Sequence, residues 1–125
     1  PPLPSVGWAL GVDRTVLALE AEGLTVAGTA RCDVYVVPLG AAARRRSVRL
    51  VADLRTAGIA TDVSYGDRGL KGAMKGADRS GARLALVVGD RDLEAGVAQC
   101  KDLTSGEQLA VALDDLTEQM RKRLL

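Results

Sequence analysis

The sequence predicts an α/β domain on a mixed five-stranded sheet, with three parallel strands, a C-terminal hairpin and three covering helices. From residue 34 onward, short apolar runs alternate with helical patterns in the order β-α-β-α-β-β-β-α. The two strand–helix–strand connections imply three parallel strands, because such crossovers are right-handed and pack their helices on the sheet. The last two strands are separated by a short polar turn, so they form an antiparallel hairpin at one side of the sheet.

The first strand–helix–strand unit begins at residues 34–37, an apolar run with β-branched and aromatic side chains that is typical of a strand. A helix is expected over residues 41–57, and Gly58 ends it before a strand at residues 59–64. The apolar stripe of this helix predicts its buried face: Ala43, Ser47, Leu50, Val51 and Leu54.

The second unit contains a helix over residues 70–80, which Gly81 ends by taking the left-handed conformation. A continuous apolar run at residues 84–88 predicts a buried strand, and residues 90–96 form a turn with about one turn of helix. The predicted buried stripe of the helix, at the spacing i, i+3, i+4, i+7, is Leu70, Ala73, Met74 and Ala77.

The C-terminal part is predicted to form a hairpin and a final helix. Strands are expected at residues 97–103 and 108–113, joined by a turn at 104–107. We expect Asp114 to cap the last helix, because a carboxylate can accept hydrogen bonds from the free amides of the first turn. Its predicted buried side consists of Leu116, Met120 and Leu124.

The N-terminal part differs from the rest. Residues 5–12 read as an apolar strand and the residues from Asp13 as a helix, but no neighbouring strand is available to pair with it. We therefore interpret residues 1–22 as a piece of another, larger sheet domain, 23–32 as a linker and 33–125 as the α/β domain. Unpaired, residues 5–20 are expected to be poorly ordered or to mediate self-association.

The composition excludes several classes of function. The chain has 125 residues, 47% hydrophobic and 26% charged, which is typical of one globular domain. It has no histidine, so histidine-based catalysis and a zinc site are not expected, and no metal ligand set is predicted. Cys32 and Cys100 are predicted to be free thiols of a cytoplasmic protein. No signal peptide, transmembrane run or membrane partner is indicated.

Charge is distributed unevenly, although the net charge is only +1. Residues 44–83 carry ten Lys and Arg against four Asp, whereas residues 84–125 carry five against eight Asp and Glu. Such asymmetry indicates a polyanionic partner at one side of the domain. A mixed, solvated surface is the alternative, and the charge pattern alone does not separate the two.

In parallel sheets, ligands meet the loops that follow the carboxyl ends of the strands. These loops are residues 38–42, 65–69 and 89–92, and the basic helix begins at the second of them. Its four-residue spacing places three cations in one row, preceded by a further cation in the loop. The candidate residues for a polyanionic partner such as a nucleic acid are Arg68, Lys71, Lys75 and Arg79, and the alternative is a solvated helix face with Asp78 as an internal partner.

Tyr65 is the one aromatic residue in a predicted ligand-side loop, where it could stack on an unpaired base. The alternative is a half-buried residue at a strand end. Leu39 and Gly40 lie in the neighbouring loop, where their backbone groups could contact base edges. The run Arg44, Arg45, Arg46 and Arg49 is interpreted mainly as a solvated helix face, with Arg44 near the loops.

Five short motifs occur in one order and spacing. They are Val34-Tyr35-Val36-Val37-Pro38-Leu39, Leu54-Arg55-Thr56-Ala57-Gly58-Ile59, Gly69-Leu70-Lys71 through Ala77-Asp78-Arg79-Ser80-Gly81-Ala82, Gly89-Asp90-Arg91-Asp92-Leu93 and Lys101-Asp102-Leu103-Thr104-Ser105-Gly106-Glu107-Gln108. Over residues 33–125 the sequence thereby resembles the C-terminal anticodon-binding domain of bacterial histidyl-tRNA synthetases. The resemblance implies that this domain binds the anticodon stem-loop of the histidine tRNA and so selects it.

Residues 6–14 resemble motif 3 of the class II catalytic domain. This implies contact of Gly11 and Arg14 with ATP, together with a longer parent that attaches histidine to tRNA using ATP and magnesium, as a homodimer. A guanidinium at such a turn can hold a phosphate through paired hydrogen bonds. No complete catalytic set is present, because motifs 1 and 2 are absent, so we expect a C-terminal fragment that is inactive alone and holds no cofactor.

Two other classes of function remain open. One is a non-catalytic, synthetase-like regulatory or protein-interaction module, such as the paralogue of histidine biosynthesis, which usually lacks the C-terminal domain. The other is a flavodoxin-like nucleotide binder. Pro38-Leu39-Gly40-Ala41 does not form the glycine-rich phosphate loop which that function requires.

Overall fold

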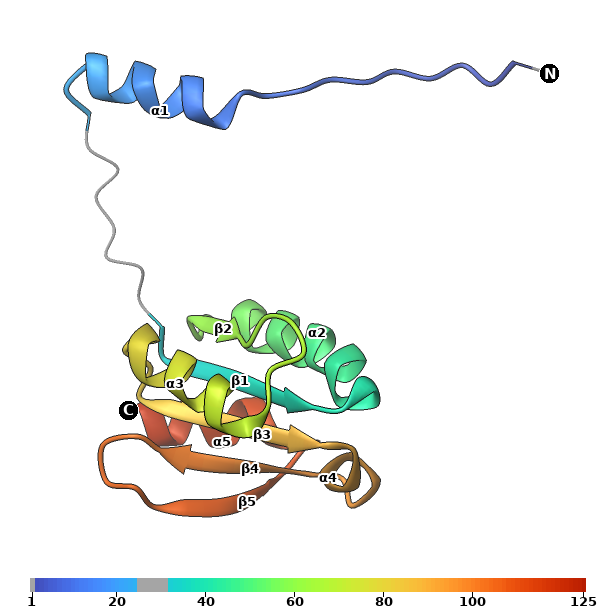
Figure 1. The fold of residues 1–125 in the computed structure, drawn as a ribbon, viewed down its shortest axis with the longest axis vertical. Coiled ribbons are helices and arrows are strands. Elements are labelled where there is room, and N and C mark those ends of the chain that lie inside the picture. The colour runs from blue at the N-terminus through green and yellow to red at the C-terminus, as the bar shows by residue number, and fades with distance from the viewer. Residues whose placement is uncertain (1, 25–31) are drawn as a thin grey trace.

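The computed structural model describes residues 2–24 and 32–125. In the second range it contains a five-stranded sheet and four helices (Figure 1). The strands are β1 (Val34–Leu39), β2 (Thr61–Val63), β3 (Leu84–Gly89), β4 (Val97–Asp102) and β5 (Gln108–Ala112). The helices are α2 (Ala41–Thr56), α3 (Leu70–Ser80), α4 (Asp90–Glu94) and α5 (Leu116–Leu124), and α1 (Val12–Ala21) lies in the first range.

The sheet has the strand order β2-β1-β3-β4-β5. β1 pairs in parallel with both β2 and β3, whereas β4 runs antiparallel to β3 and to β5. The predicted mixed sheet of three parallel strands and a C-terminal hairpin is therefore confirmed.

One face of the sheet packs on α2 and α5. Val34 and Val36 of β1 point into this core together with Leu84 and Leu86 of β3. The predicted stripe of α2 is confirmed, since Ala43, Ser47, Leu50, Val51 and Leu54 are all buried. From α5, Leu116 and Met120 are buried, and Leu124 is half-buried against the same cluster.

The other face of the sheet packs on α3. The helix lies close to the sheet because the residues of α3 that face it are small. Ala73 and Ala77 are buried against Tyr35 and Val37 of β1. A Cβ atom built on Gly76 would lie 2.7 Å from the Tyr35 hydroxyl oxygen, so any larger residue requires the buried Tyr35 ring to shift. In Figure 1, α3 lies over β1 and β3 and stops short of β4 and β5. Part of this sheet face is thus left without a covering helix in the described residues.

Several sequence predictions are corrected. Residues 5–12 do not form a strand: residues 2–11 have no regular structure and are exposed, since the described chain offers no strand to pair with. Leu70 is not buried but 49% exposed, because it lies at the first turn of α3, next to the uncovered sheet face. Asp114 does not cap α5: Asp115 occupies the N-cap position, without a side-chain hydrogen bond.

Other boundaries agree with small differences. Gly81 has φ +69° and ends α3 in the left-handed conformation, as predicted. β2 begins later than expected, because the Ile59 amide still donates to the Leu54 carbonyl oxygen of α2, at 3.0 Å. The expected linker at 23–32 falls mostly on residues 25–31, which lie outside the described residues.

The turn between β4 and β5 is built around one carboxylate. Asp102 Oδ1 accepts hydrogen bonds from the amides of Thr104 (2.8 Å) and Ser105 (2.9 Å). The amides of Ser105 and Thr104 stabilise the charged form, so the pKa of Asp102 lies below its usual value. The motif that includes Asp102 therefore has a structural role in the hairpin.

A pair of glycine substitutions in α3 tests the close packing on β1. Gly72→Ala should stabilise the domain, because the added Cβ meets only the Arg68 Cβ, at 3.9 Å, and alanine favours a helix by about 1 kcal/mol. Gly76→Ala gains the same helix propensity but overpacks Tyr35. Its unfolding free energy in urea should therefore lie about 1–3 kcal/mol below that of Gly72→Ala. Equal stability of the two variants would contradict the packing described here.

Candidate nucleic-acid interface

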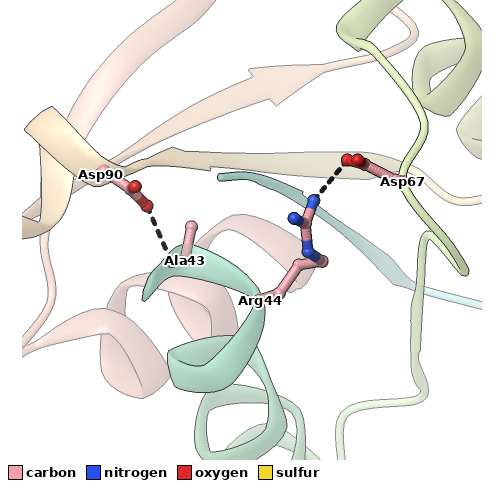
Figure 2. Close-up of polar contacts among 4 residues, drawn as sticks. All are labelled: Ala43, Arg44, Asp67 and Asp90. Atoms are coloured by element: carbon pink, nitrogen blue, oxygen red, sulfur yellow. Dashed lines mark hydrogen bonds and ion pairs between the residues drawn. The ribbon is translucent and has the colours of Figure 1, made fainter. Parts of the chain in front are cut away.

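Three loops meet at the edge of the sheet where the parallel strands end, and side-chain contacts join them (Figure 2). From the loop after β3, Asp90 Oδ1 accepts a hydrogen bond from the Ala43 amide at the start of α2, at 2.9 Å. From the loop after β2, Asp67 Oδ1 pairs with Arg44 Nη1 of α2, at 2.6 Å. The predicted gathering of these loops is therefore present.

The start of α2 is closed by Asp90. Gly40 precedes this helix with φ +105° and ψ 165°, a conformation that is essentially restricted to glycine. A Cβ atom at Gly40 would lie 2.6 Å from both carboxylate oxygens of Asp90. Leu39 and Gly40 are half-buried, and a carboxylate already occupies the end of the helix that attracts anions. Fewer backbone groups of this loop are therefore accessible to RNA than the sequence suggested.

The start of α3 has no such side-chain acceptor, and we call it the open helix start. Gly69 is its N-cap and supplies no side-chain hydrogen bond, so the amides of the first turn lack a side-chain acceptor. Arg68 and Lys71 are exposed beside it, and neither side chain has a partner among the residues that the structure describes. An open helix N-terminus with two unpaired cations attracts phosphate.

Tyr65 lies in the same loop and is 88% exposed. The alternative interpretation, a half-buried residue at a strand end, is therefore wrong. An aromatic ring held in solvent beside unpaired cations presents a face on which a base can stack.

The rest of the basic row continues along the solvent side of α3. Lys75 and Arg79 are exposed and line a shallow hollow with Asp78. Arg79 Nε donates to the Lys75 carbonyl oxygen at 3.3 Å, so the guanidinium lies back along the helix. The row is an exposed line of cations with Asp78 beside it, and Arg68 and Lys71 lie at its loop end.

The arginine run of α2 separates into two environments. Arg45 and Arg46 are exposed, and Arg49 pairs with Asp53 at 2.9 Å, as expected for a solvated helix face. Arg44 differs from them, because its side chain is 37% exposed and joins α2 to the loop of Tyr65.

Sequence reasoning missed a groove between α3 and the uncovered part of the sheet. Its apolar wall is formed by Leu70, Met74 and Val87, and its polar wall by Gln99, Lys101 and Gln108. Gln99 Nε2 donates to Asp92 Oδ1 at 3.2 Å, and Asp92 Oδ2 accepts from the Gly89 amide at 2.8 Å. The available signal was the polar pair Gln99 and Lys101 at alternate positions of an inner strand, which indicates a face without a covering helix.

Gly11 and Arg14 lie at the beginning of α1, where Gly11 is the N-cap and its carbonyl oxygen accepts from Thr15 Oγ1 at 2.9 Å. Both are exposed, and α1 buries none of its residues. The described residues therefore offer ATP one guanidinium and no enclosed phosphate site.

The two cysteines are free thiols. Burial raises the pKa of the Cys100 thiol above its usual value, which disfavours the reactive thiolate. Within residues 2–24 and 32–125, no helix is long and apolar enough to span a membrane. The same residues contain no group of three or more Cys, Asp or Glu side chains placed to hold a metal ion.

Comparison with known proteins identifies the protein family. The family model described as "Anticodon binding domain" matches residues 33–123, so the chain belongs to this family. The chain is 64% identical over 122 residues to a histidine–tRNA ligase of Saccharopolyspora erythraea and 58% identical to that of Mycobacterium tuberculosis. These matches cover 98% of this chain but only 29% of each relative.

Solved structures agree with the sequence comparison. The crystal structure of apo histidyl-tRNA synthetase from S. aureus is 39% identical, with a TM-score of 0.69, over 87% of this chain and 28% of that one. The enzyme from Nostoc sp. PCC 7120 is 30% identical, with a TM-score of 0.72, over 93% and 28%. The RNA-binding domain of a threonyl-tRNA synthetase from Cryptosporidium parvum shares the fold at 13% identity.

A second glycine pair tests the closed start of α2. Gly40→Ala should lower the unfolding free energy by about 1–3 kcal/mol through backbone strain, and further through the clash with Asp90. Gly58→Ala is the control, because Gly58 has φ +81° but nothing within 4 Å of an added Cβ. In thermal unfolding, Gly40→Ala should be the more destabilised of the two. The opposite order would contradict the close contact with Asp90.

Proposed function

We propose that this chain binds the anticodon stem-loop of the histidine tRNA and thereby selects the tRNA for a histidine–tRNA ligase. The observation that carries the proposal is the unpaired cationic surface at the open start of α3, beside the exposed Tyr65. Membership of the anticodon-binding family and the identity to histidine–tRNA ligases support it.

The cations of α3 would contact the RNA backbone. Arg68 and Lys71 lie nearest the loops, and Lys75 and Arg79 extend the surface along the helix. Phosphate contacts of this kind provide affinity that depends on salt and orient the RNA, but they carry no sequence information.

The anticodon bases would be recognised by the loop of Tyr65 and by the groove beside α3. Tyr65 would stack on an unpaired base, which contributes about 1–3 kcal/mol for each base. The groove has an apolar wall that suits the face of a base and amide and ammonium groups that suit its polar edge. Leu39 and Gly40, at the neighbouring loop, are secondary candidates.

We also propose that the chain contains parts of two domains. Residues 1–22 would belong to the catalytic domain of the longer enzyme and 33–125 would form the anticodon-binding domain, with 23–32 between them. The longer enzyme would act as a homodimer, and the exposed apolar side chains of residues 5–20 would pack against the remainder of that enzyme or a second copy.

Histidine attachment by the longer enzyme would use ATP and magnesium, with Gly11 and Arg14 near the phosphates. α1 buries none of its own residues, so in the described part of the chain it does not enclose these two residues in a phosphate site. The chain itself should show no histidine-dependent exchange between ATP and pyrophosphate.

Charge reversal tests the phosphate contacts. Lys71→Glu should weaken binding of a fluorescent histidine anticodon stem-loop several-fold in anisotropy titrations at about 50 mM salt. It should also reduce the slope of log K against log salt by about 1. Lys122→Glu makes the same charge change on α5 and is the control. No RNA binding by the unsubstituted chain, or equal weakening by both variants, would contradict the proposed surface.

A different substitution tests base recognition in the groove. Lys101→Met keeps the length of the side chain but removes its charge and donors. It should reduce the preference for the histidine anticodon over loops with one altered base by about 1–3 kcal/mol, since base contacts carry selectivity. Lys71→Glu, by contrast, should weaken binding of all these loops alike. Unchanged selectivity in Lys101→Met would exclude the groove as a base site.

A further inference from the structure

The loop that carries Tyr65 and Arg68 has little packing of its own. It follows β2, an edge strand of three residues, and the backbone reverses at Gly66 with φ +75°. Residues 65–69 are all exposed. In the described residues, the one side-chain hydrogen bond or ion pair between this loop and another element is that of Asp67 with Arg44.

The partner on α2 is firmly placed. The Arg44 amide donates to the Gly40 carbonyl oxygen at 3.0 Å, and Ser47 Oγ donates to the Arg44 carbonyl oxygen at 2.7 Å. The preceding residue, Ala43, donates its amide to Asp90. The Arg44 side chain is 37% exposed and that of Asp67 is 87% exposed. Arg44 therefore has the fixed position, and the ion pair restrains Asp67 relative to it.

The placement of Asp67 is unfavourable for binding RNA by charge alone. It puts a carboxylate between Tyr65 and Arg68, on a surface where a polyanion is expected, and like charges repel. An acidic residue at this position therefore needs another role, and its 2.6 Å contact with Arg44 gives one.

We propose that Asp67 and Arg44 are positioning residues for RNA recognition: their ion pair holds the loop so that Tyr65 and Arg68 face the RNA. This inference rests on the proposed function. A pre-ordered loop loses less conformational freedom on binding, and this increases affinity without adding a contact to the ligand. The opposite arrangement, in which Asp67 masks Arg44 from the RNA, uses the same ion pair but predicts an opposite effect.

Removal of the carboxylate distinguishes the two arrangements by sign. Asp67→Ala makes the surface more positive, so a purely electrostatic or masking role predicts tighter binding of the histidine anticodon stem-loop. The positioning role predicts several-fold weaker binding. Asp53→Ala is the matched control. It makes the same charge change and also breaks an exposed ion pair with an arginine, Arg49, but this pair lies away from the loops. It should bind RNA as well as the unsubstituted chain or slightly better.

The exchanged double variant Arg44→Asp/Asp67→Arg keeps the net charge and restores an ion pair of reversed polarity. It should regain part of the affinity lost in Asp67→Ala. The backbone ¹⁵N order parameters of residues 65–69 in the RNA-free protein provide a readout independent of binding. They should be lower in Asp67→Ala and in Arg44→Ala, and higher again in the exchanged variant.

The outcomes separate the two proposals. If the unsubstituted chain does not bind the stem-loop, the proposed function is wrong, whatever the order parameters of the loop. If it binds, and Asp67→Ala binds equally or more tightly, the positioning role is wrong although the proposed function stands. Weaker binding by Asp67→Ala, lower order parameters in the loop and unchanged binding by Asp53→Ala together support the positioning role.

Discussion

The rest of the domain depends on the burial of β1 on both faces. Val34 and Val36 point into the core formed with α2 and α5, while Tyr35 and Val37 point into the core formed with α3. The crossovers from β1 to β2 and from β2 to β3 run in opposite directions along the sheet, and both are right-handed, so α2 and α3 lie on opposite faces. β1 pairs with β2 and β3 in register, so the loops after all three strands come to one edge. The candidate RNA surface lies at this edge.

At that edge, the two helix starts differ because of one carboxylate. Asp90 closes α2, and the close approach of Gly40 makes this contact possible. α3 has no such partner at Gly69, and its nearest cations are unpaired. A phosphate group is therefore favoured at the start of α3, because the Asp90 carboxylate at the start of α2 repels anions.

Several motifs that carry the family resemblance serve the fold. Asp102 accepts two amides of the hairpin turn, Gly81 ends α3 in the left-handed conformation, and Asp92 accepts the Gly89 amide. Ser80 Oγ accepts the amide of Ala82 after the helix. Such residues are constrained by backbone geometry, so their spacing identifies the family. The groups proposed to touch RNA, such as Tyr65 and Lys101, lie largely outside these constraints.

The sequence by itself determined the order of strands and helices, the buried stripe of α2 and the glycine end of α3, because these follow from local periodicity and backbone preference. It also placed Arg68 and Lys71 at the ligand-side loops. It misread residues 5–12 as a strand, because an apolar run forms a strand only where another strand pairs with it. Only the tertiary structure brought Lys101 and Gln108 beside Met74 and joined Asp67 to Arg44, since strand register and helix placement bring distant residues together and sequence spacing does not encode them.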